Sequence, residues 1–136
     1  MEKEKKTFFP PFKKSFLQYK TSFLTLISIF YAIYKGRYKL LIAPLSIFLT
    51  SINYWRDPKH GFRRNLDISI VYFMVLYQLY YTRKYQGYTL YIFTQLTSVS
   101  FYILSRYVSN YLPELSYQFH GLLHLFYNIS NVIIYT

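Results

Sequence analysis

The sequence predicts an all-α protein, a polytopic transmembrane helix bundle of about five helices. Hydrophobic residues make up 53% and aromatic residues 24% of the 136 residues. The apolar residues gather into separate runs, and the basic residues fall between those runs. A water-soluble domain of this size keeps much of its surface exposed and could not bury so many large apolar side chains. A helical membrane protein accommodates them.

Five apolar segments, each bounded by charge, Pro or Gly, are expected to form the helices. They are Tyr19–Tyr34, Leu40–Tyr54, Leu66–Thr82, Tyr88–Tyr107 and Leu115–Tyr135. A basic tail over residues 1–18 precedes this bundle, which takes up residues 19–136. A helix needs about 20 residues to cross the hydrocarbon, so the first two segments are short and rely on Tyr and Lys at their ends. If the first segment lies in the interface instead, the bundle has four spans.

The positions of Lys and Arg predict which side of the membrane each loop faces. With five spans, one side holds eleven basic residues: Lys3, Lys5, Lys6, Lys13, Lys14, Lys20, Arg56, Lys59, Arg63, Arg64 and Arg106. The other side holds five: Lys35, Arg37, Lys39, Arg83 and Lys84. Cytoplasmic loops carry the excess of Lys and Arg, so the N-terminus is expected in the cytoplasm and the C-terminus on the far side.

Composition also excludes several classes of protein. The net charge of +11 would suit nucleic acid, but the basic residues punctuate apolar runs and form no soluble basic face, so no nucleic-acid partner is expected. Anionic lipid headgroups are the expected partner of Arg63 and Arg64. The chain has no cysteine, which excludes disulfides and thiolate metal sites.

The last segment carries two of the three histidines, His120 and His124, one helical turn apart. The same helical face continues with Asn128 and Asn131. A polar stripe exposed to lipid would be costly, so this face is expected to point into the bundle. Two interpretations remain open. The side chains can hydrogen-bond across helices, or the two imidazoles can bind one metal ion.

A second group of polar residues flanks the loop between the second and third segments. Ser51 lies near the end of one segment and Asp67 at the start of the next. Each has a structural interpretation, because Ser can bond back to its helix and Asp favours a first helical turn. In an alternating bundle, however, this loop and the loop before His120 lie on the same side. Ser51, Asp67, His120 and His124 are therefore expected at similar depth, where they can converge.

This arrangement resembles the CREST superfamily of intramembrane metal hydrolases, which includes the alkaline ceramidases. Members have a Ser followed four residues later by a His, an Asp at the start of the next helix, and a late H-x-x-x-H. Ser51, Asp67, His120 and His124 match in order and spacing. Trp55 stands where the first His is expected, and the family has more helices than this chain offers.

The resemblance implies a zinc ion held by three histidines, with a bound water that attacks a lipid amide or ester. His120 and His124 would be ligands, Asp67 a general base or water-orienting group, and Ser51 an oxyanion stabiliser. His60, in the loop, is the candidate replacement for the missing ligand. The loop "W-R-x-P…R-R-x-L-D" also resembles that of short, uncharacterised membrane proteins of large DNA viruses.

Three functions stay open at this point. The first is a zinc-dependent lipid hydrolase. The second is a non-catalytic membrane scaffold or assembly protein with a degenerate site. The third is a small channel or transporter subunit, whose polar stripe would line a pore in a homo-oligomer. Trp55 separates the first two, because an indole cannot replace an imidazole as a zinc ligand.

Overall fold

A computed structural model describes residues 12–59 and 61–136, which form six α-helices and no strand. The helices are α1 (Phe12–Ser22), α2 (Thr25–Tyr34), α3 (Tyr38–Trp55), α4 (Phe62–Thr82), α5 (Tyr88–Val108) and α6 (Pro113–Tyr135). The predicted all-α class is therefore confirmed for the described residues. The last four predicted segments correspond to α3–α6 with ends shifted by a few residues.

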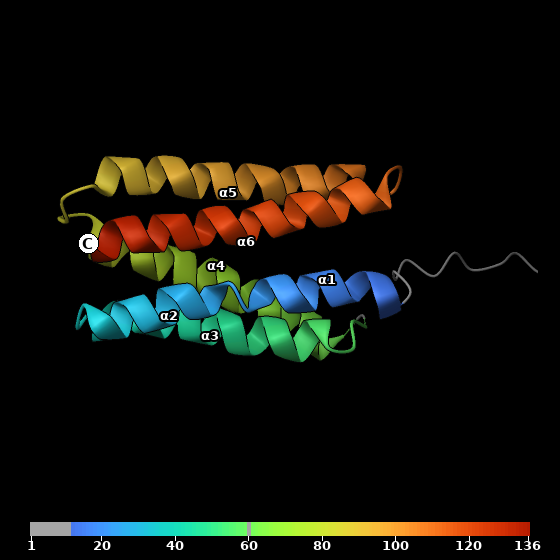
Figure 1. The fold of residues 1–136 in the computed structure, drawn as a ribbon, viewed down its shortest axis with the longest axis horizontal. Helices are drawn as coiled ribbons and strands as arrows, with labels where there is room; N and C mark the ends of the chain where they lie inside the picture. Colours follow the sequence, from blue (N-terminus) through green and yellow to red (C-terminus); the bar gives the residue numbers. More distant parts are fainter. Residues whose placement is uncertain (1–11, 60) are drawn as a thin grey trace, which may run out of the picture.

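The first predicted segment is divided between α1 and α2, which follow each other in one line with a break at Phe23 and Leu24 (Figure 1). At the break, Phe23 N–H and Leu24 N–H donate to carbonyls three residues earlier, at 3.1 and 3.0 Å. Ser22 Oγ donates back to the Gln18 carbonyl at 2.8 Å. Such side-chain bonds compete with the backbone ladder and bend helices, which accounts for the break.

A tight turn connects α2 to α3. Gly36 has a φ of 66°, a conformation that favours glycine. Arg37 N–H then donates to the Ala32 carbonyl at 2.8 Å, which is the bond pattern of a helix closed by a left-handed residue. The short turn makes α2 and α3 antiparallel neighbours.

Pro44 lies inside α3 without ending it. A proline has no N–H, so the carbonyl of the residue four positions earlier, Leu40, loses its usual donor. Tyr135, at the end of α6, donates its hydroxyl to that carbonyl at 3.4 Å. A neighbouring helix therefore supplies the hydrogen bond that the proline cannot, and α3 continues.

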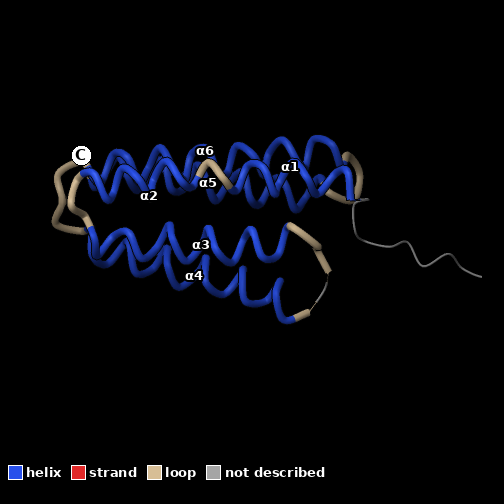
Figure 2. Tube along the Cα trace, turned by 60° about the horizontal axis from the view of Figure 1, so that its bottom comes forward, coloured by secondary structure: helices blue, strands red, loops and turns tan. Residues whose placement is uncertain are grey.

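The helices form two antiparallel hairpins, α3–α4 and α5–α6, and the α1–α2 rod packs against both α3 and α6 (Figures 1 and 2). One end of the bundle carries the start of α1, loop residues 56–59 and the loop 109–112; we call it the tail end (Figure 1). The opposite end carries the turn 35–37, the loop 83–87 and the C-terminus (Figure 1). Successive loops therefore lie at alternating ends of the bundle, as the sequence predicted. At the C-terminal end, an apolar core forms from Ala32, Leu40, Tyr91, Ile134 and Tyr135.

Membrane crossing was expected for about five segments. Within the described residues, a single helical stretch, Phe16–Tyr34, is long and apolar enough for it by length and composition. The other helices are long but rich in Tyr, Ser, Thr and Gln.

Candidate functional site

Polar side chains occupy much of the interior of the bundle. Among the described residues, the buried polar side chains outnumber the buried apolar ones and come from every helix. Many large apolar side chains lie outside instead: Phe30 of α2 is 65% exposed and Phe93 of α5 is 67% exposed. Soluble proteins bury these residue types preferentially. Compared with a soluble protein, this bundle therefore has more polar side chains in its interior and more large apolar side chains on its surface.

One polar cluster lies between α2, α4 and the C-terminal half of α6; we call it the amide network. Gln78 Nε2 donates to Asn131 Oδ1 at 2.9 Å and to the Tyr135 hydroxyl at 3.2 Å. Asn131 Nδ2 donates to Ser28 Oγ at 3.2 Å, and Ser28 Oγ donates to Asn128 Oδ1. The network joins three helices. Its side chains are buried and hydrogen-bonded, as stable polar interiors require.

The two histidines lie in the N-terminal half of α6. Their rings are in contact, with centroids 5.1 Å apart and planes inclined by 68°. His124 is buried and His120 half-buried. Together with buried Asn128 and Asn131, the predicted polar face of α6 does point into the bundle. The Trp55 ring, from the end of α3, meets the His120 ring at 5.1 Å and 69°.

Ser51 and Asp67 also meet. Ser51 Oγ and Thr50 Oγ1 each donate to Asp67 Oδ1 at 2.9 Å, across the α3–α4 hairpin. Ser51 and Asp67 are both buried. Sequence analysis missed Thr50, whose only signal was its place beside Ser51. Trp55 follows Ser51 by one turn and contacts His120, so α3 connects the Ser–Asp pair to the histidine pair.

Three buried side-chain atoms of the described residues have no hydrogen-bond partner: Gln18 Oε1, Thr25 Oγ1 and His124 Nε2. Gln18 and Thr25 lie on the α1–α2 rod, which packs against α6, the helix that carries His124. A Cβ on Gly121 would lie 3.5 Å from the Thr21 methyl, and Ser28 bonds Asn128. The two helices are therefore parallel and in register, which sets Thr25 near the level of His124.

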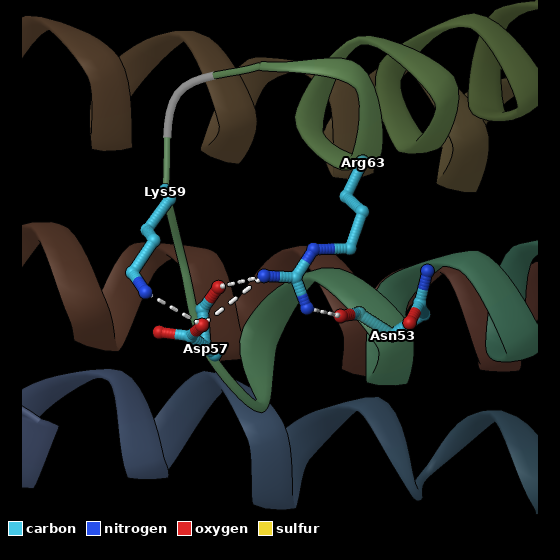
Figure 3. A network of polar contacts seen from close by, with 4 residues as sticks. All are labelled: Asn53, Asp57, Lys59 and Arg63. Atoms are coloured by element: carbon cyan, nitrogen blue, oxygen red, sulfur yellow. Dashed lines mark hydrogen bonds and ion pairs between the residues drawn. The ribbon is translucent and has the colours of Figure 1, made fainter.

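The loop between α3 and α4 is held by ionic contacts (Figure 3). Asp57 pairs with Lys59 at 3.0 Å and with Arg63 at 3.1 Å. Arg63 also donates to the backbone carbonyls of Asn53 and Asp57, at 3.3 and 3.1 Å, which caps the end of α3. The hydrogen bond from Lys59, and then that from Arg63, hold the pKa of the Asp57 carboxyl below its ordinary value.

The zinc ion implied by the resemblance requires three protein ligands and an open position. His120 and His124 supply two imidazoles, and Trp55 occupies the neighbouring position on α3. Within residues 12–59 and 61–136, no group of three His, Asp or Glu side chains is placed to hold a metal ion. His60 lies outside the described residues. The described donors thus do not fit a three-ligand zinc site.

No protein-family model, curated protein or solved structure matches this chain.

Proposed function

We propose that this chain is a multi-pass membrane protein that acts as a non-catalytic scaffold or assembly protein, with a degenerate CREST-like site. Membrane insertion is supported by the many polar side chains in the interior of the bundle and the many large apolar side chains on its surface. Phe30, Phe93 and Leu76, which is 63% exposed, would all face lipid. The buried amides and hydroxyls would be shielded from hydrocarbon, where each unsatisfied group costs several kcal/mol.

The abundance of tyrosine accounts for the weak hydropathy of the long helices. The chain has 18 tyrosines, and α4 alone contains Tyr72, Tyr77, Tyr80 and Tyr81. Tyrosine is amphipathic and is enriched where a membrane helix meets the interface. Hydropathy averaged over a window therefore underestimates such helices. In the proposed orientation, the tail end faces the cytoplasm, because eleven basic residues belong to that side and five to the other.

Trp55 is the residue that favours a scaffold over a hydrolase. It stands at the position of the expected first ligand, and its ring contacts the ring of His120. An indole has a donor N–H and no lone pair for a metal. We infer that the aromatic contact between Trp55 and His120 replaces a metal in linking α3 to α6.

The hydrolase stays as a second candidate because of two observations. Asp67 accepts hydrogen bonds from Ser51 and Thr50, a geometry suited to an oriented carboxylate. His124 Nε2 is buried without a partner, and an imidazole nitrogen with no hydrogen bond is free to bind a ligand. This function needs a third donor, for which His60 is the candidate in the sequence.

Zinc content separates the two candidates. Protein purified under zinc-replete conditions should carry no stoichiometric zinc, whereas Trp55→His should bind about one ion per chain because it supplies the third imidazole. Adding His124→Ala to Trp55→His should abolish that binding. Stoichiometric zinc in the wild type, lost in His124→Ala, would overturn the scaffold proposal in favour of the hydrolase.

Membrane topology has its own test. The chain has no native cysteine, so Lys59→Cys and Lys84→Cys each give one reactive site at opposite ends of the bundle. In sealed vesicles, an impermeant maleimide should label the two variants from opposite sides. Labelling of both from one side would contradict the proposed spans, and extraction of the protein by alkaline carbonate would contradict insertion altogether.

A further inference from the structure

The C-terminal end of the bundle, opposite the tail end, concentrates basic side chains. Five of them lie in or directly beside the two connections at this end: Lys35, Arg37, Lys39, Arg83 and Lys84. The acidic residues of the described chain are Asp57, Asp67 and Glu114, which lie in the loop or the first two turns of helices at the tail end (Figure 1). No Asp or Glu side chain of the described residues therefore neutralises the C-terminal end.

Contacts of the α2–α3 turn bring the two connections together. The guanidinium carbon of Arg37 lies 5.2 Å from the centre of the Tyr85 ring, in the loop between α4 and α5. Arg37 Nε also donates to the Tyr135 carbonyl at 3.5 Å. Tyr77, near the end of α4, donates its hydroxyl to the Lys39 carbonyl at 2.8 Å. The start of α3 therefore lies against both the end of α4 and the loop that follows it.

Four exposed cations surround these contacts, and we call them the basic face: Lys35, Lys39, Arg83 and Lys84. Two of them lie over tyrosine rings. Lys35 Nζ is 5.6 and 5.8 Å from the ring centres of Tyr31 and Tyr34, and the Arg83 guanidinium carbon is 4.2 Å from that of Tyr80. A cation–π contact restrains the side chain but uses none of its N–H donors, which can still bind an anion.

Local rules account for only part of this charge. A cation is favoured at a helix C-terminus, which suits Lys35 after α2 and Arg83 after α4. Lys39 lies in the first turn of α3, where the helix dipole disfavours it. In the proposed orientation this end faces away from the cytoplasm, where short loops are usually poor in Lys and Arg. Departures from such rules are expected where residues serve a function.

We propose that the basic face binds an acidic segment of a partner protein on the side of the membrane away from the cytoplasm. Tyr and Arg are enriched in protein interfaces, and complementary charge selects the partner and speeds its association. Anionic lipids give their negative potential to the cytoplasmic leaflet, so a carboxylate-rich protein segment fits this end better than a lipid headgroup. The inference rests on the proposed scaffold function and names the chemistry of the partner that the scaffold would hold.

Local fluorescence quenching tests the basic face. The chain has no native cysteine, so a fluorophore on Gln86→Cys reports on the basic face and one on Tyr111→Cys on the tail end; both positions are exposed. The full chain in phosphatidylcholine nanodiscs is titrated with an oligoglutamate peptide that carries a quencher, and an oligoglutamine peptide with the same quencher is the control. Quenching at position 86 should saturate with the glutamate peptide alone. It should disappear at about 1 M salt, where the Debye length is about 3 Å.

Charge variants show which end of the bundle binds the peptide. Lys39→Gln combined with Lys84→Gln should raise the Kd measured at position 86 about fivefold, because two exposed ion pairs are lost, and should leave quenching at position 111 unchanged. Arg56→Gln combined with Lys59→Gln removes the same charge at the tail end and should not change the Kd at position 86. Equal weakening by the two pairs would overturn the basic face and leave only the overall charge of the chain.

Other outcomes would also overturn the proposal. If oligoglutamate quenches position 86 no more than oligoglutamine does, the basic face binds no acidic segment, while membrane insertion stands. If the wild type instead retains phosphatidylserine in native mass spectrometry of mixed-lipid nanodiscs, and the Lys39→Gln, Lys84→Gln variant does not, the surface binds a lipid and the protein partner is wrong. If the chain does not enter the nanodisc, the proposed membrane function fails as well.

Discussion

The two halves of α6 present polar side chains on the same face but satisfy them differently. In the C-terminal half, Asn128 and Asn131 belong to the amide network, together with partners from α2 and α4. In the N-terminal half, His120 meets the Trp55 ring and His124 Nε2 has no hydrogen-bond partner. Both halves are buried or half-buried, so exposure does not account for the difference.

This difference indicates separate roles. A buried network with satisfied groups fixes which helices pack together and in which register. A buried nitrogen without a partner costs free energy and persists only where something compensates, such as a function or a ligand. We therefore assign the amide network to the fold, and the histidine half is the part of α6 that the proposed function uses. Five substitutions, each described below with its measurement, test this division.

The largest effect is expected from Asn131→Leu. It removes one acceptor of Gln78 Nε2, which keeps the Tyr135 hydroxyl, and the donor to Ser28 Oγ, which keeps Asn128 Oδ1. The free energy of unfolding should fall by about 2–3 kcal/mol, because two buried hydrogen bonds are lost at about 1–1.5 kcal/mol each. Unfolding in SDS titrations of mixed micelles measures this. Ile129→Leu, on the exposed face of α6, is the control and should change stability little.

Tyr135→Phe tests the link between α6 and the proline of α3. The substitution removes the hydroxyl that donates to the Leu40 carbonyl and accepts from Gln78. A loss of about 1–1.5 kcal/mol is expected. In a Pro44→Ala background, residue 44 regains an N–H for the Leu40 carbonyl, so the same change should cost less. An unchanged cost in this double-mutant cycle would show that the two residues are not coupled.

Thr25→Val and Ser28→Ala, one turn apart on α2, should change the stability of the protein in opposite directions. Thr25 Oγ1 is buried without a partner, so replacing the hydroxyl with a methyl of similar size should stabilise the protein by about 1 kcal/mol. Ser28 Oγ connects Asn128 and Asn131, so its loss should destabilise by about 1 kcal/mol. Destabilisation by Thr25→Val would contradict this prediction, since it would mean that the Thr25 hydroxyl does have a hydrogen-bond partner.

The smallest effect is expected at Asp57, in the loop beside the histidine half. Its hydrogen bonds to Lys59 and Arg63 lower the carboxyl pKa in the folded protein below the ordinary 3.8. A lowered pKa contributes stability that is present above the unfolded value and lost as the pH falls through the folded one. The free energy of unfolding of the wild type should therefore be slightly higher than that of Asp57→Asn at neutral pH. This difference in stability should vanish as the pH falls through the lowered pKa, on the acid side of pH 3.8. A difference that is constant with pH would refute the ionic explanation.

Hydrophobic periodicity predicts much of this fold but not all of its boundaries. Apolar runs located α3, α5 and α6 to within a few residues, because a run of that length in helix-forming residues has few alternatives. The start of α4 was placed too late, at Leu66 rather than Phe62. Its first turn is polar, with Arg63 capping the preceding helix, so composition made it look like loop.

The site was only partly predictable. The order of the loops correctly set Ser51 beside Asp67, since consecutive helices form a hairpin. The contact between Trp55 and His120, by contrast, depends on how two hairpins are rotated against each other. The bond from Tyr135 to the Leu40 carbonyl joins residues 95 positions apart. Neither relation leaves a local pattern in the sequence, because side-chain packing alone determines it.

The parallel register of α2 and α6 has a consequence for biosynthesis. Ser28 and Gln78 are made before Asn128, Asn131 and Tyr135, the residues of α6 that complete their hydrogen bonds. During translation, the nascent chain must therefore hold these polar groups without their final partners. Once α6 is made, its hydrogen bonds fix the positions of the earlier helices. A chain interrupted before residue 128 would leave the groups that α6 normally covers exposed to cellular quality control.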